Sequence, residues 1–266
     1  MMMKIKVLLR GGGDLATGVA HRLFKSGMSV VITELEKPLV IRRTVAFASA
    51  VYDGEITIEG VRGISCKNIP EYFGDYIPVI IDPECKLLKE FNPHVLVDVT
   101  MRKYNMGTNI DMAPLVIALG PGFTAGVDVH RVIETQRGHF LGQILYEGSA
   151  EPDTGIPGEI GGESWKRIVR SPADGIFISE KNIGDRISEG ELIGQVDNVE
   201  VHALLSGVLR GLIKTGLYVT KNLKIGDIDP RAKEEYINTI SDKARSLGGS
   251  VLQAIMEEFA GRFNFQ

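Results

Sequence analysis

The sequence is poor in cysteine and lacks both long apolar runs and blocks of like charge. Its two cysteines, Cys66 and Cys85, form no C-x-x-C pair, so neither a zinc ribbon nor a thioredoxin-like redox site is expected. No run of about 18 apolar residues occurs, which argues against a membrane span. No block of about five Lys or Arg residues occurs either, so we expect no nucleic-acid partner. These absences favour a cytoplasmic protein.

The remaining composition is typical of a folded chain. Of the 266 residues, 44% are hydrophobic and 24% are charged, and the formal net charge is −4. A chain of this length and composition forms one large domain or two of ordinary size.

The first half of the sequence alternates short apolar runs with a helical pattern. A helix is predicted over residues 15–25, and strands are predicted over residues 4–9, 28–32, 77–81, 95–99 and 115–119. Alternation of this kind is typical of a mostly parallel sheet with helices on its faces. We therefore expect a Rossmann-like α/β domain over residues 1–160.

The composition changes near residue 151, where residues 151–163 contain four glycines and two prolines. Beyond this break, two similar halves carry short apolar runs separated by glycine turns, which resembles a biotinyl/lipoyl-like barrel-sandwich. We expect this inserted all-β unit over residues 161–230. The hairpin joining the halves, residues 195–203, has no lysine, so no covalent biotin or lipoyl group is expected.

The last part of the chain has the periodicity of a helix. Residues 234–263 place an apolar residue at every third or fourth position, which gives one buried stripe. Gly248 and Gly249 interrupt this pattern, and glycine costs a helix roughly 1 kcal/mol relative to alanine. Such a pair is tolerable where another backbone packs close. We therefore expect residues 231–266 to pack back on the α/β domain.

The stretch RGGGDLATGVAHRL, residues 10–23, is the strongest candidate binding motif. In a turn from strand to helix, Gly11 permits a tight bend, Gly13 lets a phosphate approach the backbone, and the small Ala16 lets helix and strand pack closely. Glu34 follows the next predicted strand, about 20 positions on, where an acidic residue binds a ribose. Asp14 places a negative charge beside this loop, so a purely structural turn stays an alternative.

Two further segments supply candidate ligand contacts. Arg42 and Arg43 have the side chains suited to phosphate, although paired arginines are also common on solvated faces. The loop after residue 119 contains Gly120, Gly122, Phe123 and Thr124 at the end of a strand. The predicted cofactor-binding set is Gly11, Gly12, Gly13, Asp14, Ala16, Thr17, Glu34, Arg42, Arg43, Gly120, Gly122, Phe123 and Thr124.

Polar residues gather after this loop, but they form no known catalytic spacing. Asp128, His130, Glu134, Arg137 and His139 lie close in sequence without an H-x-x-x-H or H-E-x-x-H pattern, so no metal is expected. Asp98, Arg102 and Lys103 follow another predicted strand and fit either an anion site or a solvated turn. No G-x-S-x-G elbow occurs and no Cys lies beside a His, so no catalytic residue can be named.

Six segments together resemble the YqeB family, accessory proteins of selenium-dependent molybdenum hydroxylase systems that are related to XdhC-type Rossmann proteins. They are RGGGDLATGVAHRL, PLVIRRTVAFASAVYDG, LGPGFTAGVDVHRVIETQRGH, DTGIPG, RSPADGIF and KIGDIDPRA. The resemblance implies a role in maturing a hydroxylase client, with molybdopterin dinucleotide or another nucleotide on the glycine loop. Selenium transfer would need a thiolate, for which Cys66 and Cys85 are the candidates.

Two other functions fit the same sequence. The glycine loop would also serve an NAD(P)-dependent oxidoreductase, and the all-β unit would also suit a non-catalytic scaffold that docks the hydroxylase. Whether the chain has enzymatic activity stays open at this point. The sequence is compatible with a homo-oligomer and does not identify the ligand or the client.

Overall fold

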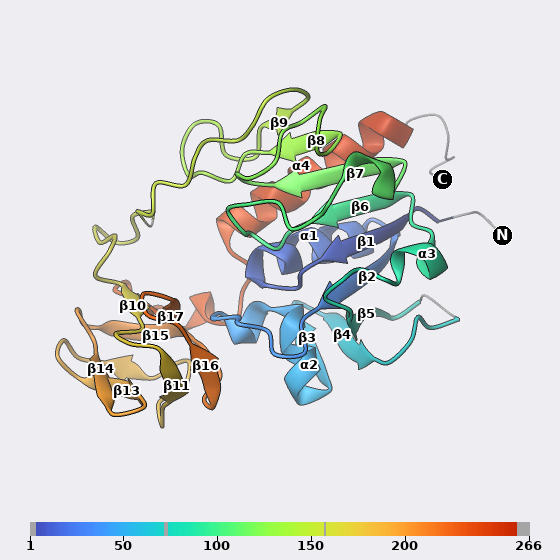
Figure 1. The fold of residues 1–266 in the computed structure, drawn as a ribbon. Helices are drawn as coiled ribbons and strands as arrows, with labels where there is room; N and C mark the ends of the chain where they lie inside the picture. Colours follow the sequence, from blue (N-terminus) through green and yellow to red (C-terminus); the bar gives the residue numbers. More distant parts are fainter. Residues whose placement is uncertain (1–3, 72–73, 157, 260–266) are drawn as a thin grey trace. The chain divides into compact units, whose positions relative to one another are not determined.

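The computed structural model describes residues 4–71, 74–156 and 158–259. The chain forms two compact units (Figure 1). The first comprises residues 1–36, 47–153 and 240–266, and the second comprises residues 37–46 and 154–239. The second unit thus contains a segment that lies within the range assigned above to the α/β domain. The predicted helical tail extends to Phe263, and its residues 260–263 lie outside the described part of the chain.

The first unit is built on one sheet of nine strands. From one edge to the other, the order is β3 (Glu55–Ile58), β4 (Val61–Cys66), β5 (Tyr76–Ile81), β2 (Ser29–Glu34), β1 (Lys6–Arg10), β6 (Val95–Asp98), β7 (Leu115–Leu119), β8 (Arg131–Ile133) and β9 (Ile144–Leu145). Neighbouring strands from β4 to β8 pair in parallel. Strands β3 and β9 pair antiparallel at the two edges.

Both faces of this sheet are buried, which explains why its central strands are almost wholly apolar. Successive side chains of β1 point to opposite faces: Val7 and Leu9 join one core, and Leu8 joins the other. The first core is covered by α1 (Asp14–Lys25) and α4 (Asp242–Phe259). The second core is covered by α3 (Leu88–Phe91) and by loops. Short helices α2 (Ala50–Asp53), η2 (Phe47–Ser49) and η3 (Ile110–Met112) complete the unit.

Helices α1 and α4 pack tightly and run in the same direction. A Cβ atom added to Gly18 would lie 2.5 Å from the carbonyl oxygen of Ala244, and one added to Gly248 would lie 2.7 Å from the carbonyl oxygen of Gly18. A Cβ on Gly248 would also lie 3.2 Å from the Cβ of Arg22. The contact of Gly18 with Ala244 is thus followed, one turn further along each helix, by the contact of Arg22 with Gly248. The two helices therefore run in parallel, and their N-termini lie at the same end.

The winding of the sheet reverses beside β1. The chain leaves β1, forms α1 and returns as β2 on one side, whereas β6 pairs with the other side of β1. In open α/β sheets a ligand crevice forms at such a reversal, outside the carboxyl ends of the strands. Here those ends are Arg10 and Asp98, which are directly opposite each other.

The second unit consists of two four-stranded antiparallel sheets with short 3-10 helices η1 (Arg43–Val45) and η4 (Glu234–Tyr236). One sheet has the order β10 (Ile168–Arg170), β17 (Lys224–Asp229), β15 (Gly207–Leu212) and β12 (Arg186–Ile187). The other has the order β14 (Val199–His202), β13 (Leu192–Val196), β11 (Gly175–Ile178) and β16 (Leu217–Val219).

The predicted fold class, a Rossmann-like mostly parallel sheet with an inserted barrel-sandwich and a C-terminal helix, is wrong. The large sheet is mixed, because β3 and β4 are joined by the two-residue turn Glu59–Gly60, whose positive φ angles of 46° and 77° favour an antiparallel hairpin. The second unit has two open sheets, with β10 and β12 at the edges of one and β14 and β16 at the edges of the other.

Candidate functional site

The glycine turn lies between β1 and α1, at the reversal of the sheet. Gly11 has a φ angle of +98°, and a Cβ there would lie 3.2 Å from the carbonyl oxygen of Val99. A Cβ on Gly12 would lie 3.0 Å from Cγ2 of Ile32 and 3.1 Å from the backbone nitrogen of Ala48. These two glycines therefore let neighbouring parts of the chain approach closely. Gly13 is the residue that precedes α1 as its N-cap.

Glu34 ends β2 and holds the glycine turn. The Gly12 N–H donates to Oε1 at 2.8 Å and the Leu35 N–H donates to Oε2 at 2.7 Å. Burial raises the pKa of Glu34, and these two backbone donors offset part of that effect. A carboxylate has about four lone-pair positions, so two acceptor positions remain beyond these contacts.

The other residues of the predicted loop have structural partners. Ala16 packs in the core beneath α1. Thr17 is buried, and its hydroxyl accepts a hydrogen bond from the Phe47 N–H at 2.9 Å. Asp14 is the first residue of α1, where a negative charge is favourable beside the positive end of the helix.

Asp98 organises the loop that follows β6. Its carboxylate is buried and accepts hydrogen bonds from the hydroxyls of Thr108, at 2.6 Å, and Thr100, at 2.7 Å. Arg10 donates to the Thr108 hydroxyl at 2.9 Å. Of the two cations predicted beside Asp98, Arg102 contacts Tyr104 and Lys103 pairs with Asp153.

The structure gives the second predicted loop mainly packing contacts. A Cβ on Gly120 would lie 2.8 Å from Oγ1 of Thr135, and a Cβ on Gly122 would lie 2.8 Å from the backbone of Tyr104. Phe123 belongs to the core on the sheet face opposite α1. The Thr124 N–H donates to the carboxylate of Asp128 at 2.7 Å.

The titratable groups after this loop serve backbone or pairing roles. His130 accepts the Val116 N–H at 2.9 Å through Nδ1, and burial lowers its pKa. Glu134 accepts N–H groups of Gln136 and Glu151 at 2.6 and 2.7 Å. His139 stacks edge to face on Phe140. Within the described ranges, no group of three His, Cys, Asp or Glu side chains could hold a metal ion.

Both cysteines lie where the thiol is favoured over the thiolate. Burial raises the pKa of Cys66, which is partly buried, and of Cys85, which is buried beside Thr33. The thiolate is the reactive form, so neither environment favours a sulfur or selenium carrier.

Arg42 and Arg43 belong to the second unit, whereas the glycine turn belongs to the first. Arg42 donates to the carbonyl oxygens of Tyr236 and Thr239 at 2.9 and 3.1 Å. Arg43 donates to the carbonyl oxygen of Leu212 at 2.8 Å. The structure thus gives both side chains backbone partners inside their own unit.

A residue that the sequence did not single out, Lys243, lies at the carboxyl edge of the large sheet. It is the second residue of α4, and the charges of Asp14, Glu134, Asp153 and Arg137 act on it. Burial, with a smaller contribution from Arg137, lowers its pKa. No local pattern marks this position, because only the packing of α4 on α1 brings it there.

The strand order and the two units define an α/β protein whose mixed sheet reverses its winding beside β1. Comparison with known proteins identifies a relative by its sequence. The chain is 50% identical over 254 residues to the uncharacterized protein YqeB of Escherichia coli (strain K12). These residues make up 94% of the chain but only 47% of YqeB, so the chain spans about half the length of this relative. The similarity supports the resemblance to YqeB. No family model matches the chain.

Comparison with solved structures found only weak similarities. An aspartoacylase family protein from Mesorhizobium loti has 10% identity and a TM-score of 0.27, with 85% of each chain covered. The ectoine utilization protein EutE (DoeB) from Ruegeria pomeroyi has 12% identity and a TM-score of 0.25, covering 85% of this chain and 86% of its own. A succinylglutamate desuccinylase/aspartoacylase from Rhodobacter sphaeroides has 13% identity and a TM-score of 0.25, with 85% of each chain covered.

These comparisons correct the functional expectation. The similar structures named above are not molybdenum hydroxylase accessory proteins, and the YqeB relative carries no assigned role. The expected part in hydroxylase maturation, with its molybdenum and selenium chemistry and its hydroxylase-docking alternative, is therefore contradicted. At these TM-scores, the similarities do not define an activity for this chain either. Among the described helices, none is long and apolar enough to cross a membrane.

Proposed function

We propose that the chain binds a nucleoside phosphate at the carboxyl edge of the nine-stranded sheet. The observation that carries this proposal is the parallel packing of α1 and α4, which directs two helix N-termini to one edge. Each helix N-terminus carries roughly half a positive charge and presents backbone N–H groups. Two of them side by side favour a phosphate more strongly than one.

Lys243 adds a full positive charge at the same edge. Its ammonium group makes no hydrogen bond or ion pair of 4.0 Å or less within residues 4–71, 74–156 and 158–259, although Asp14, Glu134 and Asp153 attract it from farther away. A half-buried ammonium without a direct partner has lost part of its hydration without full compensation. A phosphate oxygen would supply that partner through a charge-assisted hydrogen bond.

Glu34 supports a nucleoside rather than a bare phosphate. Its two remaining acceptor positions suit neutral hydroxyl donors, such as the vicinal hydroxyls of a ribose. A second anion would be repelled there by the negative charge of the buried carboxylate. The ribose is therefore assigned to the end of β2 and the phosphates to the ends of α1 and α4.

Asp14 sets the strength of the proposed phosphate contact. Its charge is attracted by Lys243 and lies at the beginning of α1, where it offsets part of the positive potential. The proposed site is therefore tuned to moderate affinity.

The test is calorimetric titration of the full chain with ADP and, separately, with inorganic pyrophosphate. Replacing Lys243 by Met removes a charge-assisted contact of about 1.5–3 kcal/mol, so both ligands should bind at least about tenfold more weakly. Lys25→Met, an exposed change at the far end of α1, is the matched control and should bind both ligands normally. Glu34→Gln should weaken ADP and spare pyrophosphate. Failure of the native chain to bind ADP, or normal binding by Lys243→Met, would overturn the proposal.

A further inference from the structure

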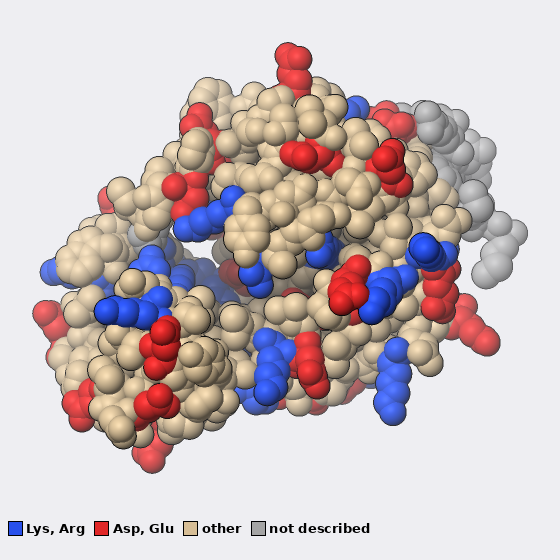
Figure 2. Space-filling view, viewed as in Figure 1, with Lys and Arg blue, Asp and Glu red and all other residues tan. Residues whose placement is uncertain are grey.

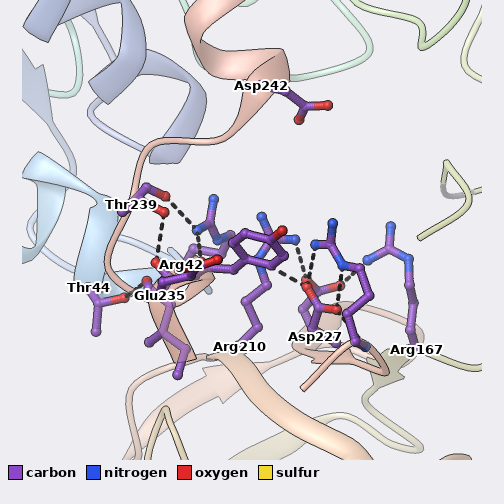
Figure 3. Close-up of polar contacts among 12 residues, drawn as sticks. Arg42, Thr44, Arg167, Arg210, Asp227, Glu235, Thr239 and Asp242 are labelled. Atoms are coloured by element: carbon purple, nitrogen blue, oxygen red, sulfur yellow. Dashed lines mark hydrogen bonds and ion pairs between the residues drawn. The ribbon is translucent and has the colours of Figure 1, made fainter. Parts of the chain in front are cut away.

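The second unit contains a cluster of arginines around two buried aspartates, defined here as the arginine cluster: Arg167, Arg210, Arg231, Lys224, Asp227 and Asp229. Asp227 and Asp229 are alternate residues of β17, so both carboxylates lie on one face of that strand. Both are 2% exposed. Figure 3 shows Asp227 between the side chains of Arg167 and Arg210.

Arg210 reaches the aspartates because of an irregularity in β15. The pairing of β15 with β17 shifts between Leu209 and Gly211, so Arg210 is the extra residue of a β-bulge. Bulges redirect a side chain, and they occur frequently next to functional sites. The Arg210 side chain is thereby brought to within 3.7 Å of Asp227 and 3.9 Å of Asp229.

The arginine cluster holds more positive than negative charge. Asp227 pairs with Arg167 and with Lys224, the latter at 3.3 Å, and Asp229 takes two hydrogen bonds from the Arg231 side chain, at 2.9 and 2.6 Å. With Arg210 included, four cationic side chains lie around two carboxylates in the cluster. Although burial alone would raise it, the pKa of Asp229 is lowered by Arg231 and Arg210, so this carboxylate stays ionised.

Arg210 is the member of the cluster with the weakest contacts. It is only 8% exposed, and its Nε atom has no hydrogen-bond partner among the described residues. Its two carboxylate distances are too long for hydrogen bonds. A buried guanidinium in this state has given up water without receiving full compensation.

The geometry points to a second binding site, for a phosphate dianion, at Arg210 in the arginine cluster. A dianion suits a cluster in which cationic side chains outnumber carboxylates, and a phosphate group has enough acceptor oxygens to engage several guanidinium N–H groups together. Arg231 and Lys224, whose side chains are 37% and 36% exposed, form the outer rim through which the ligand would enter. In Figure 2, Lys and Arg side chains gather over this region of the second unit, near β10 and β17.

The test uses inorganic phosphate as the probe and separates this site from the one proposed at the sheet edge. In a Lys243→Met background, calorimetry should still detect phosphate binding, and phosphate should raise the melting temperature more than sodium chloride at equal ionic strength. Adding Arg210→Gln should abolish both effects. The matched control is Arg170→Gln, which changes an exposed arginine of β10 and should leave both effects in place.

A second variant keeps the test decisive if Arg210→Gln does not fold. Lys224→Met removes a charge from the partly exposed rim and should weaken phosphate binding several-fold. Phosphate binding that is unchanged by both substitutions would overturn the proposal, as would equal stabilisation by chloride. Loss of ADP binding in Lys243→Met with retained phosphate binding would support both sites, whereas retained ADP binding would refute only the first.

Discussion

Replacing Gly18 by Ala should destabilise the first unit, even though alanine is the better helix former. The new Cβ would lie 2.5 Å from the carbonyl oxygen of Ala244 and 2.6 Å from its Cβ. These atoms belong to a helix that is itself packed in the core, so they cannot move away cheaply. Overpacking of this kind costs about 1–3 kcal/mol. The helix propensity of alanine returns about 1 kcal/mol, so the net loss should be as much as about 2 kcal/mol.

The assay is urea unfolding followed by circular dichroism, with the midpoint compared at an unchanged slope. Gly249→Ala is the matched control, because nothing lies within 4 Å of a Cβ at that position of α4. That substitution should stabilise the chain by about 0.5–1 kcal/mol, since it restricts the unfolded state without a clash. Opposite signs for the two changes are the expected result. A Gly18→Ala chain stabilised as much as Gly249→Ala would refute the close packing of α1 and α4.

Three further changes probe the two proposed sites. Asp14→Asn removes the negative charge beside the phosphates and should strengthen ADP binding several-fold by calorimetry. ADP affinity should fall as the pH rises through the lowered pKa of Lys243, below the ordinary lysine value of about 10.4, whereas Lys243→Arg should keep its affinity because a guanidinium stays charged. Arg210→Met should change the free energy of unfolding in urea by less than about 1 kcal/mol, instead of the roughly 3–5 kcal/mol lost when a buried pair is broken, because Arg167 and Arg231 still hold the two aspartates. A large loss of stability would show that Arg210 is a structural partner.

The central strands were predictable because burial on both faces makes them continuous apolar runs. Predicted strands occur at β1, β2, β5, β6 and β7, close to the observed bounds. The edges of the sheet carry no such pattern. Strand β3 is largely accessible to solvent, and β8 and β9 have only three and two residues. The antiparallel edge strands β3 and β9 make the sheet mixed. The fold class therefore depended on strands whose sequences carry little apolar pattern.

The candidate site was predictable only where its residues are local in sequence. The glycine turn and Glu34 are 22 residues apart and meet through the hydrogen bond from the Gly12 N–H. Arg42 and Arg43 looked equally close in sequence, but the chain crosses into the second unit between residues 36 and 47. Lys243 arrives from near the other end of the chain through the packing of α4, which no local motif encodes.

Each proposed site contains a cationic side chain with carboxylates nearby. Those carboxylates accept no hydrogen bond from it. Lys243 is attracted by Asp14, Glu134 and Asp153, and Arg210 lies 3.7 and 3.9 Å from Asp227 and Asp229. Each cation is thus partly neutralised and still able to donate to a phosphate. The sites differ in their second requirement, because only the sheet edge has a carboxylate, Glu34, with acceptor positions for a ribose. Inorganic phosphate should therefore displace ADP from the sheet edge only at concentrations above those that fill the arginine cluster, since only ADP gains the Glu34 contact.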